Sequence, residues 1–139
     1  MNEDFVSYEI AKKLKEKGFK EKCIAYYWEK INEHTPSFVV EDKMPEDGLC
    51  LIDLLSNHNR AEWSPFIDAP TISQVLKWLR EKKLHIELWT VGKKPIKWCH
   101  TITTLNHVGE KQGWSSGTRE DSYEAAAIAG IKYVIDNLI

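Results

Sequence analysis

The stretch TISQVLKWLREKKLHIELWTVGKKPIKWCHTITTL, residues 71–105, decides the fold because its hydrophobic period changes along its length. In the first part, apolar residues recur at the three- and four-residue spacing of an amphipathic helix: Ile72, Val75, Leu76 and Leu79. Thr71 and Gln74 form the T-x-x-Q pattern of a capping box at its start. We therefore expect a helix over 71–83.

The second part of the stretch is typical of a β-hairpin. β-Branched and aromatic residues dominate 85–91 and 96–105, and the turn-forming sequence Gly-Lys-Lys-Pro separates them. Alternation along the second strand divides its side chains between two faces. One face holds Ile96, Trp98, His100, Ile102 and Thr104, and the other holds Lys97, Cys99, Thr101, Thr103 and Leu105. The first face is the apolar one.

Towards the N-terminus, an apolar repeat every four positions predicts a helix over 3–17, with Asp4 or Asn2 as its cap and Gly18 as its stop. The short apolar runs 23–28 and 37–40 are expected to form a hairpin.

Towards the C-terminus, 108–118 is interpreted as a loop, or as a segment with a further strand around 113–116. The last helix is expected from Asp121 or Ser122 to the terminus, because one stripe of apolar and small residues follows: Tyr123, Ala126, Ala127, Gly130, Ile131, Val134 and Leu138.

Together these elements predict an α+β fold, an antiparallel sheet of about four or five strands with helices packed on one face. The chain has 139 residues, of which 42% are apolar and 29% charged, so we expect residues 1–139 to form a single globular domain. Double-stranded-RNA-binding domains share a helix, strands, helix arrangement, although this chain has more elements than their minimal version.

The segment 41–69 is rich in Pro, Asp, Asn, Ser and Gly around one apolar patch, and it matches no regular element. Connections of this length inside a compact domain are commonly functional. One hypothesis is therefore a small enzyme with a cleft under the 41–69 segment, beside Asp53, His58 or Glu62.

Two segments, APTISQVLKWLREKKLHIEL and SYEAAAIAGIKYVIDNLI, resemble small proteins encoded by Bacteroides genomes and their phages. The similarity covers mainly residues 69–91 and 122–139. A weaker similarity lies in YEIAKKLKEKGF near the N-terminus. The resemblance implies a phage or prophage context, and it implies no activity, ligand or catalytic residue.

No cofactor, metal or catalytic residue is expected from the motifs. The five histidines and three cysteines lack the spacing of known metal sites, and neither a GxSxG elbow nor a P-loop occurs. An odd number of widely spaced cysteines predicts reduced thiols and a cytoplasmic location. No run approaches the eighteen or so apolar residues of a membrane helix, so a membrane partner is not expected.

The strongest candidate for a binding surface is the segment 77–98, which is basic and aromatic. From Lys77 to Lys97 there are seven basic and two acidic residues, although the chain as a whole has a net charge of −2. By strand parity Trp89 shares a face with Glu87 and Val91, and we expect it to be exposed. The candidate residues are Lys77, Trp78, Lys82, Lys83, Trp89, Lys93 and Lys94.

Two interpretations of this segment are open. Lysines interleaved with tryptophans suit a binding or interaction module, and the partner is either a protein, which we favour, or nucleic acid. Lysines on a helix exterior and in a hairpin turn also occur as a solvated face that discourages edge pairing. The leading hypothesis is a non-enzymatic binding module, a phage or prophage accessory protein, with the small enzyme as the alternative.

Overall fold

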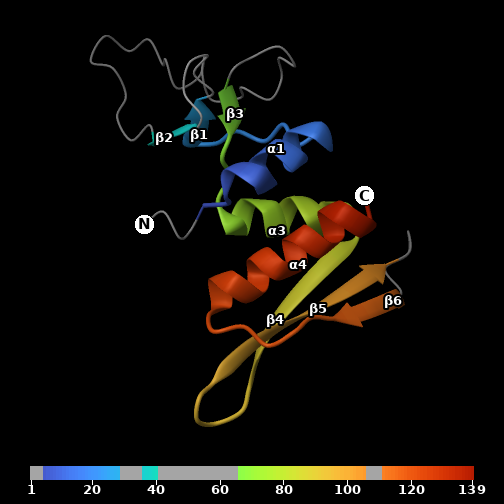
Figure 1. The fold of residues 1–139 in the computed structure, drawn as a ribbon. Helices are drawn as coiled ribbons and strands as arrows, with labels where there is room; N and C mark the ends of the chain where they lie inside the picture. Colours follow the sequence, from blue (N-terminus) through green and yellow to red (C-terminus); the bar gives the residue numbers. More distant parts are fainter. Residues whose placement is uncertain (1–4, 29–35, 41–65, 106–110) are drawn as a thin grey trace. The chain divides into compact units, whose positions relative to one another are not determined.

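The computed structural model describes residues 5–28, 36–40, 66–105 and 111–139 (Figure 1). These residues form three helices and two antiparallel sheets of three strands each, which confirms the α+β class. The prediction of one sheet with four or five strands is wrong, because the strands pair within two separate sheets.

The described residues fall into two compact units, Phe5–Thr71 and Ile72–Ile139. Each unit contains one of the sheets. The organisation of 1–139 as a single domain stays a prediction.

The first unit contains α1 (Tyr8–Glu16), β1 (Ala25–Trp28), β2 (Ser37–Val40) and β3 (Phe66–Asp68). The strand order is β2-β1-β3, so the expected hairpin of β1 and β2 is confirmed. The third strand comes from the end of the irregular segment, with Ile67 opposite Tyr27 of β1. Tyr27 also donates a 2.7 Å hydrogen bond from its hydroxyl to the carbonyl oxygen of Val6, which ties the start of the unit to its central strand.

Helix α1 begins later than expected, because its cap is Ser7 and not Asp4 or Asn2. The Ser7 side chain accepts a hydrogen bond from the backbone N–H of Ile10, which satisfies one of the free donors of the first turn. Gly18 ends the helix as predicted, with a φ of +88°. The N–H of Phe19 then bonds back to the Leu14 carbonyl and that of Gly18 to the Lys15 carbonyl, which is the Schellman arrangement of a helix end.

The second unit contains α3 (Ile72–Glu81), β4 (Leu84–Val91), β5 (Lys97–Leu105), β6 (Lys111–Ser116) and α4 (Tyr123–Asn137). The hairpin of β4 and β5 is confirmed, with Leu88 opposite His100. The 113–116 segment is a strand, since β6 pairs with β5 and completes the sheet order β4-β5-β6.

Both helices of the second unit contact the sheet and each other, and Figure 1 shows α4 lying along it. Gly130 of α4 comes so close that an added Cβ would lie 3.0 Å from Ile86 and 3.2 Å from the ring of His100. The face that carries His100 and Ile102 is therefore the inner face, as its apolar pattern predicted. The core between the layers includes Val75, Leu79, Ile102, Ile131 and Val134, each at most 1% exposed.

Among the described helices, none combines the length and the apolar character that crossing a membrane requires.

Candidate binding surface

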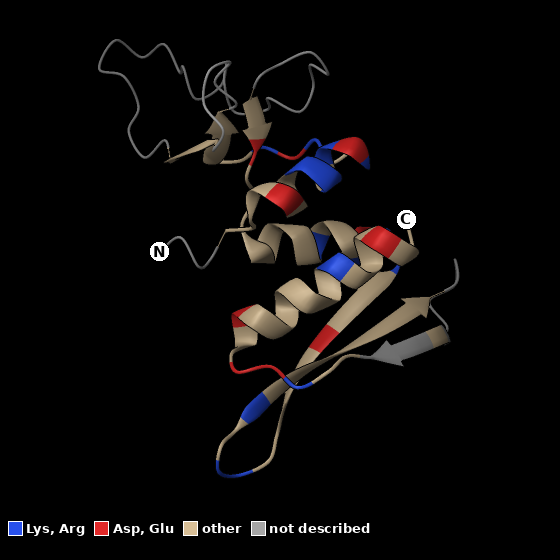
Figure 2. Ribbon diagram, viewed as in Figure 1, with Lys and Arg blue, Asp and Glu red and all other residues tan. Residues whose placement is uncertain are grey.

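Six of the seven candidate residues lie in two groups at opposite ends of β4, and the seventh, Trp89, lies within that strand near the turn. Lys77 and Trp78 lie in α3, and Lys82 and Lys83 follow that helix directly, whereas Lys93 and Lys94 lie in the turn beyond β4. At a rise of about 3.3 Å per residue, the eight residues of β4 separate the two groups by roughly 25 Å. Figure 2 shows the second group at the tip of the hairpin, away from α3. The structure does not bring the seven residues into one continuous surface.

Trp78 lies at the first end and is only 7% exposed, so it offers no open ring for stacking. The Nζ of Lys82, which directly follows the helix, lies 4.6 Å from the centre of the Trp78 ring. This contact is a cation–π interaction within the chain. The apolar residues at three- and four-residue spacing did not predict the burial of Trp78. The buried face of α3 is wider than the stripe that those residues form.

Lys83 has a role in the fold as well as an exposed side chain. Its φ is +67°, in the left-handed region, and its carbonyl oxygen accepts a 2.9 Å hydrogen bond from the N–H of Leu105. This residue therefore turns the chain from α3 into β4 while continuing the ladder to β5.

Trp89 dominates the hairpin end. Its side chain is 42% exposed, as strand parity predicted, and it points to the face of the sheet opposite α4. Its Nε1 donates a 2.9 Å hydrogen bond to the Oγ1 of Thr101 on β5. A large aromatic ring is thus held in one orientation on the outer face of the sheet.

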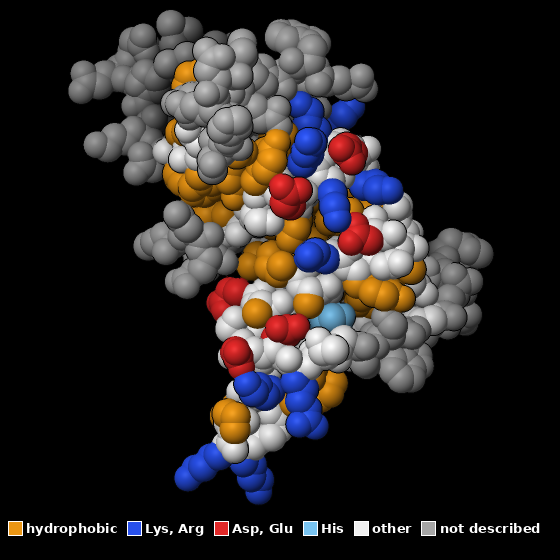
Figure 3. Space-filling model, viewed as in Figure 1, with side chains coloured by type: hydrophobic (Ala, Val, Ile, Leu, Met, Phe, Trp, Pro, Cys, Tyr) orange, Lys and Arg blue, Asp and Glu red, His pale blue; other side chains and the backbone are white. Residues whose placement is uncertain are grey.

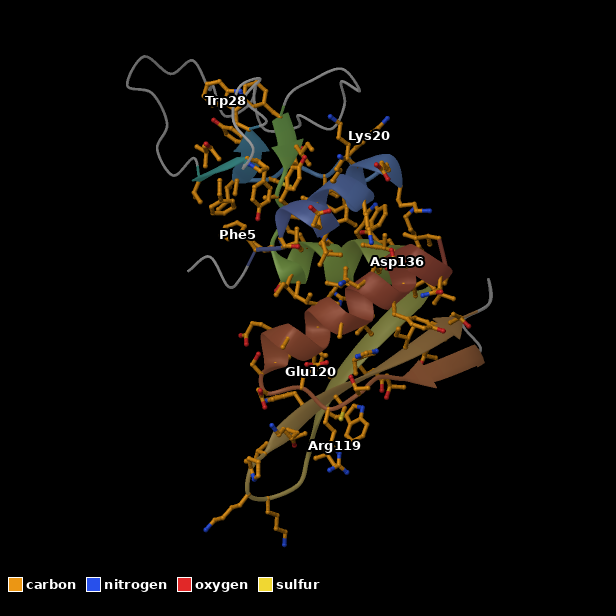
Figure 4. All side chains as sticks on the ribbon, viewed as in Figure 1. Phe5, Lys20, Trp28, Arg119, Glu120 and Asp136 are labelled. Carbon is orange, nitrogen blue, oxygen red and sulfur yellow. The ribbon has the colours of Figure 1, made fainter. Side chains whose placement is uncertain are left out.

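Two further cations share this outer face, Lys97 and Arg119. Lys97 stands opposite Val91 in the ladder, and its Nζ forms an ion pair with Asp121. Arg119 precedes Glu120, which pairs with Trp98, so alternation places Arg119 beside Cys99 on the Trp89 face. Figure 4 labels Arg119 at this end of the sheet. The sequence did not predict Arg119 as a binding residue, because no local pattern indicates that the chain after β6 pairs again with β5.

Carboxylates accompany these cations. Asp121 accepts a hydrogen bond from Lys97, and that bond with the charge of Lys97 lowers the pKa of the exposed Asp121 carboxyl below its ordinary value. Glu120 and Glu124 lie close by, before and within the first turn of α4. Figure 3 shows acidic and basic side chains next to each other here, whereas the charged side chains at the tip of the hairpin are all basic. The hairpin end is an aromatic surface with a mixed charged rim.

His100 and Cys99 are both buried and differ in the face they occupy. The Nδ1 of His100 has no hydrogen-bond partner among the described residues, and burial lowers the pKa of its imidazole, although the charge of Glu120 opposes this effect. Within the described part of the chain, no group of three or more potential ligands could hold a metal ion. His34, Cys50, His58 and His107 lie outside that part.

Cys23 and Cys99 are free thiols. Burial, together with the nearby carboxylates of Asp68 and Glu21, raises the pKa of the Cys23 thiol. A thiol held in its neutral form is a poor nucleophile. Cys23 is therefore a core residue of the first unit, and its thiol is held in the neutral form.

The enzyme hypothesis rests on residues outside the described ranges. Most of the 41–69 segment, with Asp53, His58 and Glu62, lies in 41–65. At the end of the segment, Phe66–Asp68 forms strand β3 and Ala69 is fully buried. These residues therefore contribute to the fold of the first unit.

Comparison with models of protein families, with curated proteins and with solved structures finds no match to this chain.

Proposed function

We propose that this chain is a non-enzymatic binding module that engages a protein partner through the hairpin end of the β4-β5-β6 sheet. The observation that carries the proposal is Trp89, whose large ring is exposed yet fixed by its hydrogen bond to Thr101. Tryptophan is among the residues that most often dominate the energy of protein interfaces. A ring already held in place loses less conformational entropy on binding.

The surroundings of Trp89 favour a protein over nucleic acid. A polyanion needs a track of cations, but here Lys97 is paired with Asp121 and the cations at the two ends of β4 are far apart. A mixed charged rim around an aromatic centre suits a protein interface, in which polar groups surround a few anchoring side chains. Lys93 and Lys94 extend the rim at the exposed turn.

The cytoplasm is the proposed location, on the cysteine pattern, in which an odd number of thiols is widely spaced. The proposed context is that of a phage or prophage accessory protein, which rests on the resemblance of residues 69–91 and 122–139 to proteins of Bacteroides and their phages. Both proposals are compatible with a module that acts by binding.

The test is affinity capture from a lysate of the native host, with and without nuclease. The variant combines Trp89→Ala with Lys93→Glu and Lys94→Glu. The matched control changes two exposed cations of α3, Lys77→Glu and Arg80→Glu. We expect the full chain to retain a protein after nuclease treatment, the control to retain it as well, and the hairpin variant to lose it while keeping its far-UV circular dichroism spectrum.

Two results would contradict the proposal. Capture that disappears on nuclease treatment would show that nucleic acid is the ligand. Capture that survives the hairpin variant but not the α3 control would place the binding surface at the other end of β4.

A further inference from the structure

Strand β4 is an edge of its sheet. In the order β4-β5-β6 it pairs with β5 on one side, and no described strand pairs with it on the other. An edge strand offers a row of backbone donors and acceptors that an additional strand can use.

The hydrogen bonds around β5 show which groups of β4 point outwards. The N–H of Leu105 bonds to the carbonyl of Lys83, so these two residues form a hydrogen-bonded pair. Such pairs alternate along an antiparallel ladder, which means that the odd-numbered residues of β4 bond to β5. The N–H and carbonyl groups of the even-numbered residues therefore point away from the sheet. They belong to Leu84, Ile86, Leu88 and Thr90.

This edge lacks the usual features that prevent strand addition. Its pairing with β5 is continuous from Leu84 to Val91, whereas the pairing of β5 with β6 shows a register shift between Thr104 and Leu105. The strand contains no proline and a single charged residue, Glu87. Natural edge strands are commonly protected by prolines, bulges or inward charges. Here the lysines flank the strand and do not interrupt it.

A second copy of the chain fits this edge poorly. Antiparallel pairing of β4 with its own copy, with matching faces, has two registers that keep seven of the eight strand residues paired. One register, centred on Leu88, sets Lys83 opposite Lys93 and Lys82 opposite Lys94. The other sets Glu87 opposite its own copy. Like charges directly opposite each other are destabilising in a sheet.

We infer that the β4 edge receives an extended segment of a partner protein, with carboxylates near both of its ends and apolar side chains at alternate positions between them. Its carboxylates face the exposed Lys82 and Lys83 at one end and Lys93 and Lys94 at the other. This inference rests on the proposed function, because it defines how the partner binds.

The side chains along β4 fit such a segment. On the inner face Ile86 and Leu88 are only half-buried, so alternate apolar side chains of an added strand would cover them. On the outer face Trp89 belongs to the edge strand, and its indole extends over β5 to Thr101, so the ring leaves the edge open. An added strand would thus lie next to the strand that carries the aromatic ring.

The probe is a synthetic peptide in which valine and threonine alternate over eight positions between two pairs of glutamates. We expect amide exchange of Ile86, Leu88 and Thr90, followed by NMR in the full chain, to slow at least tenfold when the peptide saturates the protein. The amides of His85, Glu87 and Trp89, already bonded to β5, should change little. A peptide with lysines in place of the glutamates should bind at least tenfold more weakly.

A variant of the chain gives a second measurement. Thr90→Pro removes an outward N–H without removing a ladder bond to β5, and proline is tolerated at such edge positions. We expect it to weaken peptide binding at least fivefold, while the matched Thr90→Val variant binds like the wild type. If Thr90→Pro fails to fold, the exchange pattern of the unmodified chain decides the question.

The inference is overturned if the glutamate peptide causes no slowing of the three amides, or if the lysine peptide binds equally well. It is also overturned if those amides are already protected in a dimer of the free chain, since a second copy would then occupy the edge. Failure of the peptide, while the Trp89 variant still loses its captured protein, would leave the proposed function standing.

Discussion

His100 faces α4 from the central strand of its sheet, and two glycines stand close to its ring. An added Cβ would lie 3.2 Å from the ring at Gly130 and only 1.8 Å from Cε1 at Gly117. Neither the period of β5 nor that of α4 signals the approach at Gly117, because the chain between β6 and α4 has no regular pattern. The buried imidazole and the glycine that makes room for it form one packing unit.

We expect Gly117→Ala to destabilise the fold by about 1–3 kcal/mol, because the new methyl group overlaps the imidazole in a packed region. Replacing His100 with Ala as well should recover part of that loss, since the clash then disappears. The free energy of unfolding is measured by urea denaturation of both single variants and the double variant. Additive effects in the double variant would contradict the contact.

The burial of His100 predicts a pH dependence. Burial lowers the pKa of His100 below the ordinary value of 6.5, so the unfolded chain binds its proton at a higher pH than the folded chain does. At a pH above 6.5 the titration of His100 therefore does not change the free energy of unfolding. As the pH falls from 6.5 towards the pKa of His100 in the folded chain, the free energy of unfolding decreases. We expect wild type to lose more stability between about pH 7 and pH 5 than His100→Gln does. Parallel curves for the two proteins, from urea denaturation across that range, would show that His100 does not titrate in this way.

At the scale of the element, the C-terminal ends of α1 and α3 differ in the residue type that adopts the left-handed conformation. Both place a residue in the left-handed region, Gly18 at a φ of +88° and Lys83 at +67°. A side chain in that region costs roughly 1–2 kcal/mol, and glycine does not bear this cost. The sequence signals the first end by its glycine, whereas Lys83 gives no such signal, which is why the end of α3 was expected two residues too late.

We expect opposite effects from exchanging these residue types. Gly18→Ala should destabilise the fold by about 1 kcal/mol through backbone conformation alone, because nothing lies within 4 Å of the added Cβ. Lys83→Gly should stabilise it by roughly 0.5 kcal/mol, since relief of the strained φ outweighs the greater freedom of glycine in the unfolded chain. Thermal and urea denaturation measure both. Destabilisation by Lys83→Gly would mean that its side chain matters more than its backbone.

At the scale of the whole molecule, the local patterns predicted elements better than their assembly. The hairpin of β4 and β5, its inner face and the exposure of Trp89 followed from alternation, which is a property of neighbouring residues. The division into two sheets depends on β1 pairing with β3, about forty residues later, and no local pattern carries that information. The candidate surface failed to form one patch for the same reason, since residues close in sequence lie at both ends of a long strand.

The distribution of charge in the molecule is also relevant to its partner. Residues 72–139 contain ten basic and seven acidic residues, a net charge of +3, whereas residues 5–71 contain nine basic and twelve acidic residues, a net charge of −3. The excess in the second unit is small, and carboxylates at the start of α4 lie among the cations of the hairpin end.

We therefore expect nucleic acid to bind weakly and with little dependence on salt. Each phosphate neutralised contributes about −0.9 to the slope of log affinity against log salt concentration. Binding through the two lysines at only one end of β4 would therefore give a slope near −2. Filter binding of duplex RNA and single-stranded DNA between about 50 and 200 mM salt measures that slope. A slope near −4, abolished when Lys82, Lys83, Lys93 and Lys94 are all changed to Glu without loss of the fold, would require both ends of β4 to contact one nucleic acid. The protein-partner proposal would then be wrong, because the same lysines that flank the β4 edge would be occupied by phosphates.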